Sequence, residues 1–360
     1  MKKLICVLSL LLALTTGCST QLSMSDHSTA NTISTSGVFS SSRTTPDSKV
    51  TNQTKQPDPF TEINMTTTNF GYAITQNRHV LKTLDGGMEW ADVLENSASP
   101  ADLNESAISI PDGETVLIAS FTDSGVQVKK SEDAGRSWSG AEIKLEPDDP
   151  NSGYGGSLAM SFVNPSDGYL LASGLPAAGK MGKVLYKTAD GGSSWSFVSA
   201  NLNPEKGSEG LTEINGYPTG LAFSSIKTGY ITSTYHGQKE VSVYRTGDGG
   251  THWSAASVPL PEKFASLIYE RDYYVDAYPP AFYGRDKKSA KMELYFCHNE
   301  ERHAYIYSSN DGGADWQIEG ASNLLMKKYC FQDEQNGFGI DENGTLYTTQ
   351  NGGLTWLDKY

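Results

Sequence analysis

Histidine, arginine, cysteine and tryptophan are all scarce in this 360-residue sequence. Only six histidines occur, and the closest pair, His298 and His303, is five residues apart on a predicted turn. That spacing is more often found in polar surface residues than in a zinc site. The Asp-Gly-Gly runs recur as turns and do not form the glycine-rich loop that cradles a nucleotide phosphate. The sequence therefore predicts no bound metal and no cofactor.

Positive charge is also in deficit, and this excludes two classes of partner. The chain has 28 basic and 42 acidic residues, which gives a formal net charge of −14. An acidic surface repels the phosphate backbone of nucleic acid and the anionic headgroups of a membrane. No run after Leu14 is apolar enough to span a bilayer. Membrane association would therefore have to come from the N-terminus.

The N-terminus has the pattern of a secretory signal. Lys2 and Lys3 precede an apolar run over residues 4–14, and small residues lead to Cys18. The site resembles a bacterial lipobox, which implies that residues 1–17 are removed and that Cys18 carries a lipid. We expect a lipid-anchored protein on the extracytoplasmic face of a bacterial cell membrane. An ordinary signal peptide with an incidental cysteine is the alternative.

Residues 18–59 are rich in Ser, Thr, Asn and Gln and almost lack large apolar residues. Such a segment cannot bury enough surface to offset its ordering entropy, so we predict a flexible tether. Beyond it, Cys297 and Cys330 are the remaining cysteines of the body. They could pair in the oxidising space outside the cytoplasm, or they could stay as two buried free thiols.

A short motif occurs six times and contains every tryptophan of the protein. Each copy reads Ser or Thr, any residue, Asp, any residue, Gly, two further residues and Trp, with Asn in the last copy. The acidic or amide side chain can accept hydrogen bonds from the turn, and glycine can take the positive φ that the turn needs. The tryptophan buries a large flat area against its hairpin. The paired positions are Asp85 and Trp90, Asp133 and Trp138, Asp190 and Trp195, Asp248 and Trp253, Asp311 and Trp316, and Asn351 and Trp356.

The motif resembles the Asp-box, or bacterial neuraminidase repeat, of sialidase-like β-propellers. Gly168-Tyr169, followed by the strand and box over residues 185–195, is also similar to propellers of the photosystem II assembly-factor type. The resemblance covers residues 60–360 and implies a propeller fold. It also implies that the box stabilises a turn away from the active centre.

One repeat unit is predicted to be a blade of four antiparallel strands. Short aromatic or β-branched strands precede each box, and an apolar residue stands six positions before a Gly-aromatic pair in four units. The sequence thus predicts an all-β, six-bladed β-propeller over residues 60–360, with seven blades as the alternative. Because no spare strand is available to be shared between the two ends, ring closure should depend on apolar contact between the first and last blades.

Ligand sites on propellers usually lie near the channel. We expect the ligand site of this protein on the face opposite the turns that the repeated motif forms, where links join successive blades. Tyrosines recur at the ends of these links. We predict that Tyr154, Tyr217 and Tyr278, with Tyr273 nearby, line a binding surface. The alternative is that they fill the funnel and pack blade on blade.

Catalysis is the competing hypothesis. The sequence lacks the Arg-Ile-Pro stretch of sialidases, and its seven arginines are poorly placed for their arginine cluster. A glycoside hydrolase needs only two opposed carboxylates, for which Asp272 and Glu213 are the weak candidates. We therefore predict a non-catalytic lipoprotein propeller that binds a protein, peptide or glycan as an assembly or sensing scaffold, with glycoside hydrolysis as the alternative.

Overall fold

In the computed structural model, the described residues are 58–93, 106–144, 156–175, 181–201, 210–235, 241–270 and 272–360. All of them belong to one compact unit, Gln53–Tyr360. The predicted signal peptide, Cys18, all but the last two residues of the tether, and Tyr154 lie outside the described residues. Among the described residues, no helix has the length and apolar character needed to cross a bilayer.

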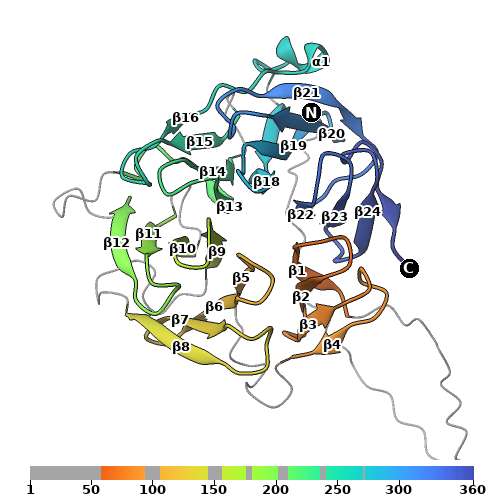
Figure 1. Ribbon diagram of the computed structural model, residues 1–360. Coiled ribbons are helices and arrows are strands. Elements are labelled where there is room, and N and C mark those ends of the chain that lie inside the picture. Colours follow the sequence, from red (N-terminus) through yellow and green to blue (C-terminus); the bar gives the residue numbers. More distant parts are fainter. Residues whose placement is uncertain are drawn as a thin grey trace, which may run out of the picture. The chain divides into compact units, whose positions relative to one another are not determined.

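The body is a β-propeller, which confirms the predicted all-β fold (Figure 1). Its strands form antiparallel meanders arranged in a ring, and each meander runs outward from the centre in chain order. We number these meanders as blades 1 to 6. The strands of blades 1 to 3 are β1 (Phe60–Met65), β2 (Gly71–Thr75), β3 (Val80–Thr83) and β4 (Ala91–Asp92); β5 (Ala107–Ser109), β6 (Val116–Thr122), β7 (Gly125–Ser131) and β8 (Ser139–Lys144); and β9 (Ser157–Phe162), β10 (Gly168–Ser173), β11 (Lys183–Thr188) and β12 (Ser196–Ala200).

Blades 4 to 6 complete the ring. Their strands are β13 (Tyr217–Phe223), β14 (Gly229–Thr234), β15 (Val243–Thr246) and β16 (Ser254–Ala255); β17 (Tyr274–Ala277), β18 (Ala281–Tyr283), β19 (Ser289–His298), β20 (Glu301–Ser309) and β21 (Gln317–Ser322); and β22 (Lys328–Phe331), β23 (Gly337–Ile340), β24 (Leu346–Thr349) and β25 (Leu357–Asp358). Hydrogen bonding groups the strands into five sheets, because the pair Thr234 and Asp276 joins blades 4 and 5 into one nine-stranded sheet.

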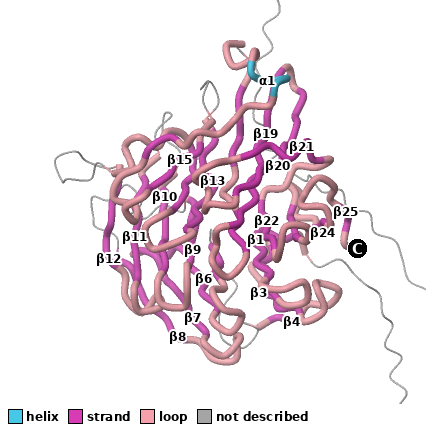
Figure 2. Tube along the Cα trace, turned by 45° about the horizontal axis from the view of Figure 1, so that its top comes forward, coloured by secondary structure: helices cyan, strands magenta, loops and turns pink. Residues whose placement is uncertain are grey.

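Blade 5 departs from the other blades in two ways. Its inner strand is split into β17 and β18, which pair with successive parts of β19. Pro279 and Pro280 lie at the break, where they have no N–H to donate to the ladder. Its strands β19 and β20 are also the longest, and Figure 2 shows them extending beyond the other blades towards α1 (Glu262–Ala265). Phe264 of α1 is buried and stacks on Phe296 at 4.9 Å.

The ring closes without a shared strand, as predicted. Phe60, Ile63 and Met65 of β1 pack with Phe338 and other buried apolar residues of blade 6. Polar contacts add to this interface: the Phe60 N–H donates to the Gly344 carbonyl at 2.9 Å. The C-terminal Tyr360 hydroxyl also donates to a box turn of blade 1, at the Gly87 carbonyl. Closure therefore depends on apolar packing supported by hydrogen bonds.

The six repeated motifs form one turn, which we call the box turn, between the third and fourth strands of each blade. In every copy the Ser or Thr hydroxyl donates to the Asp or Asn side-chain oxygen and accepts from the N–H of the glycine at the fifth position of the motif, at 2.8–3.0 Å. The same side-chain oxygen accepts from the N–H four residues later at 2.8–3.1 Å. This fifth-position glycine has φ between 85° and 93°, a left-handed conformation that favours glycine. The motif thus encodes the fold.

Both body cysteines are free in the structure, so the Cys297–Cys330 disulfide, one of the two alternatives, is not formed. Cys297 lies in β19, where it pairs with Tyr274 of the same blade. Cys330 lies in β22, and its Sγ accepts a hydrogen bond from the Met65 N–H across the ring closure at 3.3 Å. Burial raises the Cys330 thiol pKa to about 11, so the thiol stays protonated at neutral pH.

Candidate functional site: the central channel

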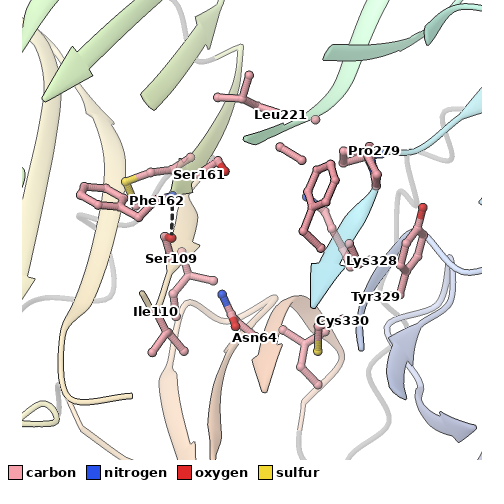
Figure 3. Close-up of a pocket in the computed structure, with 18 of the residues that line it drawn as sticks. Asn64, Ser109, Ile110, Ser161, Phe162, Leu221, Pro279, Lys328, Tyr329 and Cys330 are labelled. Carbon is pink, nitrogen blue, oxygen red and sulfur yellow. Dashed lines mark hydrogen bonds between the residues drawn. The ribbon is translucent and has the colours of Figure 1, made fainter. Parts of the chain in front are cut away.

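The inner strands surround a channel that contains two adjoining cavities, of which Figure 3 shows the larger. The larger, about 520 Å³, is lined by the C-terminal ends of the inner strands, where the chain turns back beside the box turns. The smaller, about 410 Å³, is lined by their N-terminal ends. We call them the box-side and link-side cavities. Volumes of this size are typical of ligand sites.

An ion pair lies where the two cavities meet. Glu62 of β1 and Lys328 of β22 line both cavities, and their Oε1 and Nζ atoms are 2.6 Å apart. Burial raises the pKa of Glu62, while the Lys328 ammonium acts against this rise. The pair joins the first and last blades of the ring, so it contributes both to closure and to the polarity of the channel.

Small polar side chains of the inner strands link neighbouring blades around the channel. The Ser109 hydroxyl accepts from the Phe162 N–H at 3.3 Å, a bond drawn in Figure 3. Ser161 accepts from the next blade's Phe223 N–H at 2.9 Å, and Cys330 plays the same part towards Met65. Each acceptor stands directly before an apolar residue at the end of its blade's inner segment, which is Ile110, Phe162 or Phe331. These contacts hold the strand ends at fixed positions around the box-side cavity.

The box-side cavity has an excess of positive charge in a protein of net charge −14. Four cationic side chains line it, and Glu62 is its one acidic lining residue. The cations are Arg285, Lys287, Lys327 and Lys328. Because Glu62 is already paired with Lys328, three cations lack a carboxylate partner among the cavity's lining residues. A concave site lined with one sign of charge concentrates ions of the opposite sign.

The link-side cavity is lined by hydroxyl groups and by fewer charges. Its hydroxyl residues are Thr61, Thr75, Ser106, Ser157, Ser173 and Thr219. Ser173 is 1% exposed, and its hydroxyl has no hydrogen-bond partner among the described residues. The charged residues that line the link-side cavity are Glu62, Lys328 and Arg78. Arg78 has a left-handed backbone conformation, with φ of 67°. The two ends of the channel therefore differ chemically.

A buried acid lies beside the channel wall, between blades 5 and 6. Glu293 of β19 is 1% exposed; its Oε1 accepts from the Met326 N–H at 3.4 Å, and its Oε2 has no partner among the described residues. Burial raises its pKa well above the usual value. The Tyr329 hydroxyl accepts from the Glu293 N–H at 2.9 Å and donates to the Tyr278 carbonyl. This network stabilises the blade interface.

The three predicted tyrosines that the structure describes do not form one surface. Tyr273 is 3% exposed and packs in the core beneath α1, which corrects the prediction that it binds a partner. Its ring fills the space between Phe264 and the long strands of blade 5. Tyr278 packs on Tyr295 at 5.1 Å and is half-buried, and Tyr217 begins β13. Neither Tyr217 nor Tyr278 lines the two cavities, although Pro218 and Pro279 beside them do.

The two weak catalytic candidates lie outside the channel. Glu213 and Asp272 are exposed, and neither lines a cavity. Glycoside hydrolysis needs two carboxylates facing one space, and the lining residues of the two cavities supply only Glu62. Within the described ranges, no cluster of three or more His, Cys, Asp or Glu is placed to hold a metal ion.

Sequence reasoning missed the residues that define the channel. Glu62 and Lys328 are far apart in the chain, and neither belongs to the repeated motif. Arg285 and Lys287 lie in a segment as long as the turn between the first and second strands of the other blades. This segment is not followed by the Gly-aromatic pair found in four other units, and that difference is visible in the sequence. Ser109, Ser161 and Cys330 share a position one residue before the conserved apolar position of the repeat unit, which alignment of the six units would have shown.

No known family model matches this sequence, and no curated protein matches it significantly. Solved structures do resemble it in fold. A protein of unknown function from Dyadobacter fermentans is 10% identical, with a TM-score of 0.50, over 83% of this chain and 93% of that one. A YCF48 bound to D1 peptide is 15% identical, with a TM-score of 0.48, over 84% and 80%. A GH74 enzyme from Niastella koreensis is 16% identical, with a TM-score of 0.49, over 84% and 45%. At these identities the likeness concerns the fold alone.

Proposed function

We propose that this chain is a lipid-anchored, extracytoplasmic propeller that binds a protein or peptide partner in its central channel and has no catalytic role. The observation that carries the proposal is the channel itself. Its two adjoining cavities are each large enough for a small ligand or a few residues of an extended chain. They are lined by charged, hydroxyl and apolar groups, which together can fix the orientation of a ligand.

Backbone geometry favours a peptide over a glycan. The inner strands β1, β5, β9, β13, β18 and β22 each pair with other strands on one side only. Their other edges carry backbone donors and acceptors of the kind that an extended peptide can use. In contrast, all six tryptophans belong to box turns, so the channel has no tryptophan platform on which a sugar ring could stack.

The test is partner capture by the full chain with an open and with a blocked channel. Asn64 of β1 lines the box-side cavity, and its side chain makes no hydrogen bond to a described residue, so Asn64→Trp should fill space without removing a structural bond. The control is Asn69→Trp, at an exposed position outside both cavities.

Peptides selected by display on the wild-type protein should bind Asn69→Trp normally and Asn64→Trp at least about tenfold more weakly. Thermal unfolding should show that both variants remain folded. Equal binding by the wild type and by folded Asn64→Trp would show that the partner does not enter the channel. Hydrolysis of fluorogenic glycosides by the wild type would instead support the glycoside hydrolase alternative.

A further inference from the structure

Five of the six blades turn in the same way between their first and second strands. Two residues after the last apolar residue of the inner strand, a side-chain oxygen accepts hydrogen bonds from two backbone N–H groups of the turn. The five acceptors are Thr67, Asp112, Asn164, Ser225 and Asp333. In four of these turns the residue directly before the acceptor also donates its backbone N–H to the carbonyl four residues after itself.

The turn of blade 5 has the same length but a different structure. It spans residues 284–288, between β18 and β19, and Arg285 occupies the position of the side-chain acceptor. A guanidinium group has no acceptor atom, so it cannot cap the turn. The turn instead has Gly284 at φ of 77° and Lys287 at φ of 49°, with the Lys287 N–H donating to the Gly284 carbonyl. A non-glycine residue in the left-handed region is costly, which suggests a functional reason.

This altered turn brings two cations to the mouth of the box-side cavity. The Lys287 ammonium reaches from blade 5 to blade 3 and donates to the Phe162 carbonyl at 2.9 Å. Burial lowers the pKa of Lys287, and no carboxylate among the described residues pairs with it. Arg285 is exposed, lines the same cavity and has no ion pair within the part of the chain that the structure describes. Lys327 of the neighbouring blade adds a third positive charge.

We propose that the β18–β19 turn makes the box-side mouth of the channel a carboxylate-binding site, with Arg285 and Lys287 as its ligand-binding residues. The proposal rests on the proposed function and specifies it: the partner is a peptide that presents an acidic side chain or its C-terminal carboxylate. The Arg285 guanidinium can hold a carboxylate with two parallel hydrogen bonds, and the Lys287 ammonium supplies a partly desolvated charge. Phe162 and Phe282, which line the same cavity, offer apolar contact to the rest of the peptide.

The test is the binding of fluorescently labelled hexaglutamate to the full chain, measured by fluorescence anisotropy against hexaglutamine. Hexaglutamate should bind more tightly, and its affinity should fall as salt is raised. A C-terminally amidated hexaglutamate distinguishes the two sources of carboxylate. Arg285→Asn and Lys287→Gln should each weaken binding about tenfold. Lys288→Gln is the matched control, because Lys288 is exposed in the same turn but lies outside the cavity lining.

Stability separates a binding role from a structural one. Arg285→Asn supplies the acceptor that the other five turns have, so it should maintain or raise the melting temperature while it weakens peptide binding. Lys287→Gln keeps an N–H that can donate to the Phe162 carbonyl. Equal binding of hexaglutamate and hexaglutamine, no detectable binding of either, or equal losses in Lys288→Gln and Arg285→Asn would each overturn the proposal.

The same variants distinguish failure of this inference from failure of the proposed function. If Asn64→Trp abolishes capture of the selected peptides but Arg285→Asn and Lys287→Gln do not, the channel binds a partner without this carboxylate site. If Asn64→Trp leaves capture unchanged, the proposed function itself is wrong.

Discussion

Lys183 gives the sharpest stability prediction, because it is a buried cation that forms no ion pair with an acidic side chain among the described residues. It is 1% exposed in β11, and its Nζ donates to the Met181 and Ile214 carbonyls at 3.2 and 3.1 Å. Burial lowers its pKa from 10.5 to about 8. At about 1.4 kcal/mol for each unit of pKa, charging this lysine costs the folded state about 3 kcal/mol.

The sign of the pH dependence follows from linkage. Below pH 8 the lysine is protonated in both the folded and the unfolded chain, so the folded protein bears the full cost. Between pH 8 and 10.5 the folded protein releases the proton first, and the cost disappears. Relative to Lys183→Met, the wild type should therefore gain about 2.5 kcal/mol of unfolding free energy between pH 7 and pH 10.

Urea unfolding of the wild type and Lys183→Met at the two pH values measures this difference. Loss of the two hydrogen bonds to the carbonyls lowers the variant's stability equally at both pH values, so it cancels from the comparison. Lys187→Met, at an exposed position of the same strand, is the control and should keep the wild-type pH profile. A constant difference between the wild type and Lys183→Met from pH 7 to pH 10 would refute the reasoning.

Three further predictions concern the box turn, the blade interface and the ring closure. Asp190→Ala removes bonds from Thr188 and Ser194 and should lower the unfolding free energy by about 1–3 kcal/mol without changing peptide capture; weakened capture by folded protein would contradict this. Burial raises the pKa of Glu293, so the stability from its neutral form is present below pH 4.5 and is lost as pH rises; Glu293→Gln should therefore be more stable than the wild type at pH 8 and equally stable at pH 4, as measured by urea unfolding. Cys330→Ser should keep the acceptor for the Met65 N–H, whereas Cys330→Val should cost about 1–2 kcal/mol in thermal unfolding, and equal melting temperatures would argue against that bond.

Local chemistry made much of the fold predictable. The box residues act on backbone atoms within a few positions, so their spacing is visible in the sequence and recurs in every blade. The four-strand order and the closure by apolar contact followed from that repeat. Blade 5 was harder to predict, because its inner strand is interrupted at Pro279 and Pro280 and its link to blade 4 includes α1.

The candidate site was far less predictable, because it depends on which inner-strand residues meet around the axis. Glu62 and Lys328 become neighbours only when the ring closes. Tyr273 had the composition expected of a binding surface, yet α1 and the long hairpin of blade 5 cover it. The distinguishing turn at Arg285 could be interpreted only after the other five turns showed which interaction that position normally makes.

The central claim is that the partner occupies the channel, and site-specific photo-crosslinking tests it most directly. A photoreactive phenylalanine analogue at position 64 lies in the box-side cavity, whereas one at position 69 lies outside both cavities. With a display-selected peptide bound to the full chain, we predict cross-links from position 64 and none from position 69. Cross-links from position 69 alone would contradict the account.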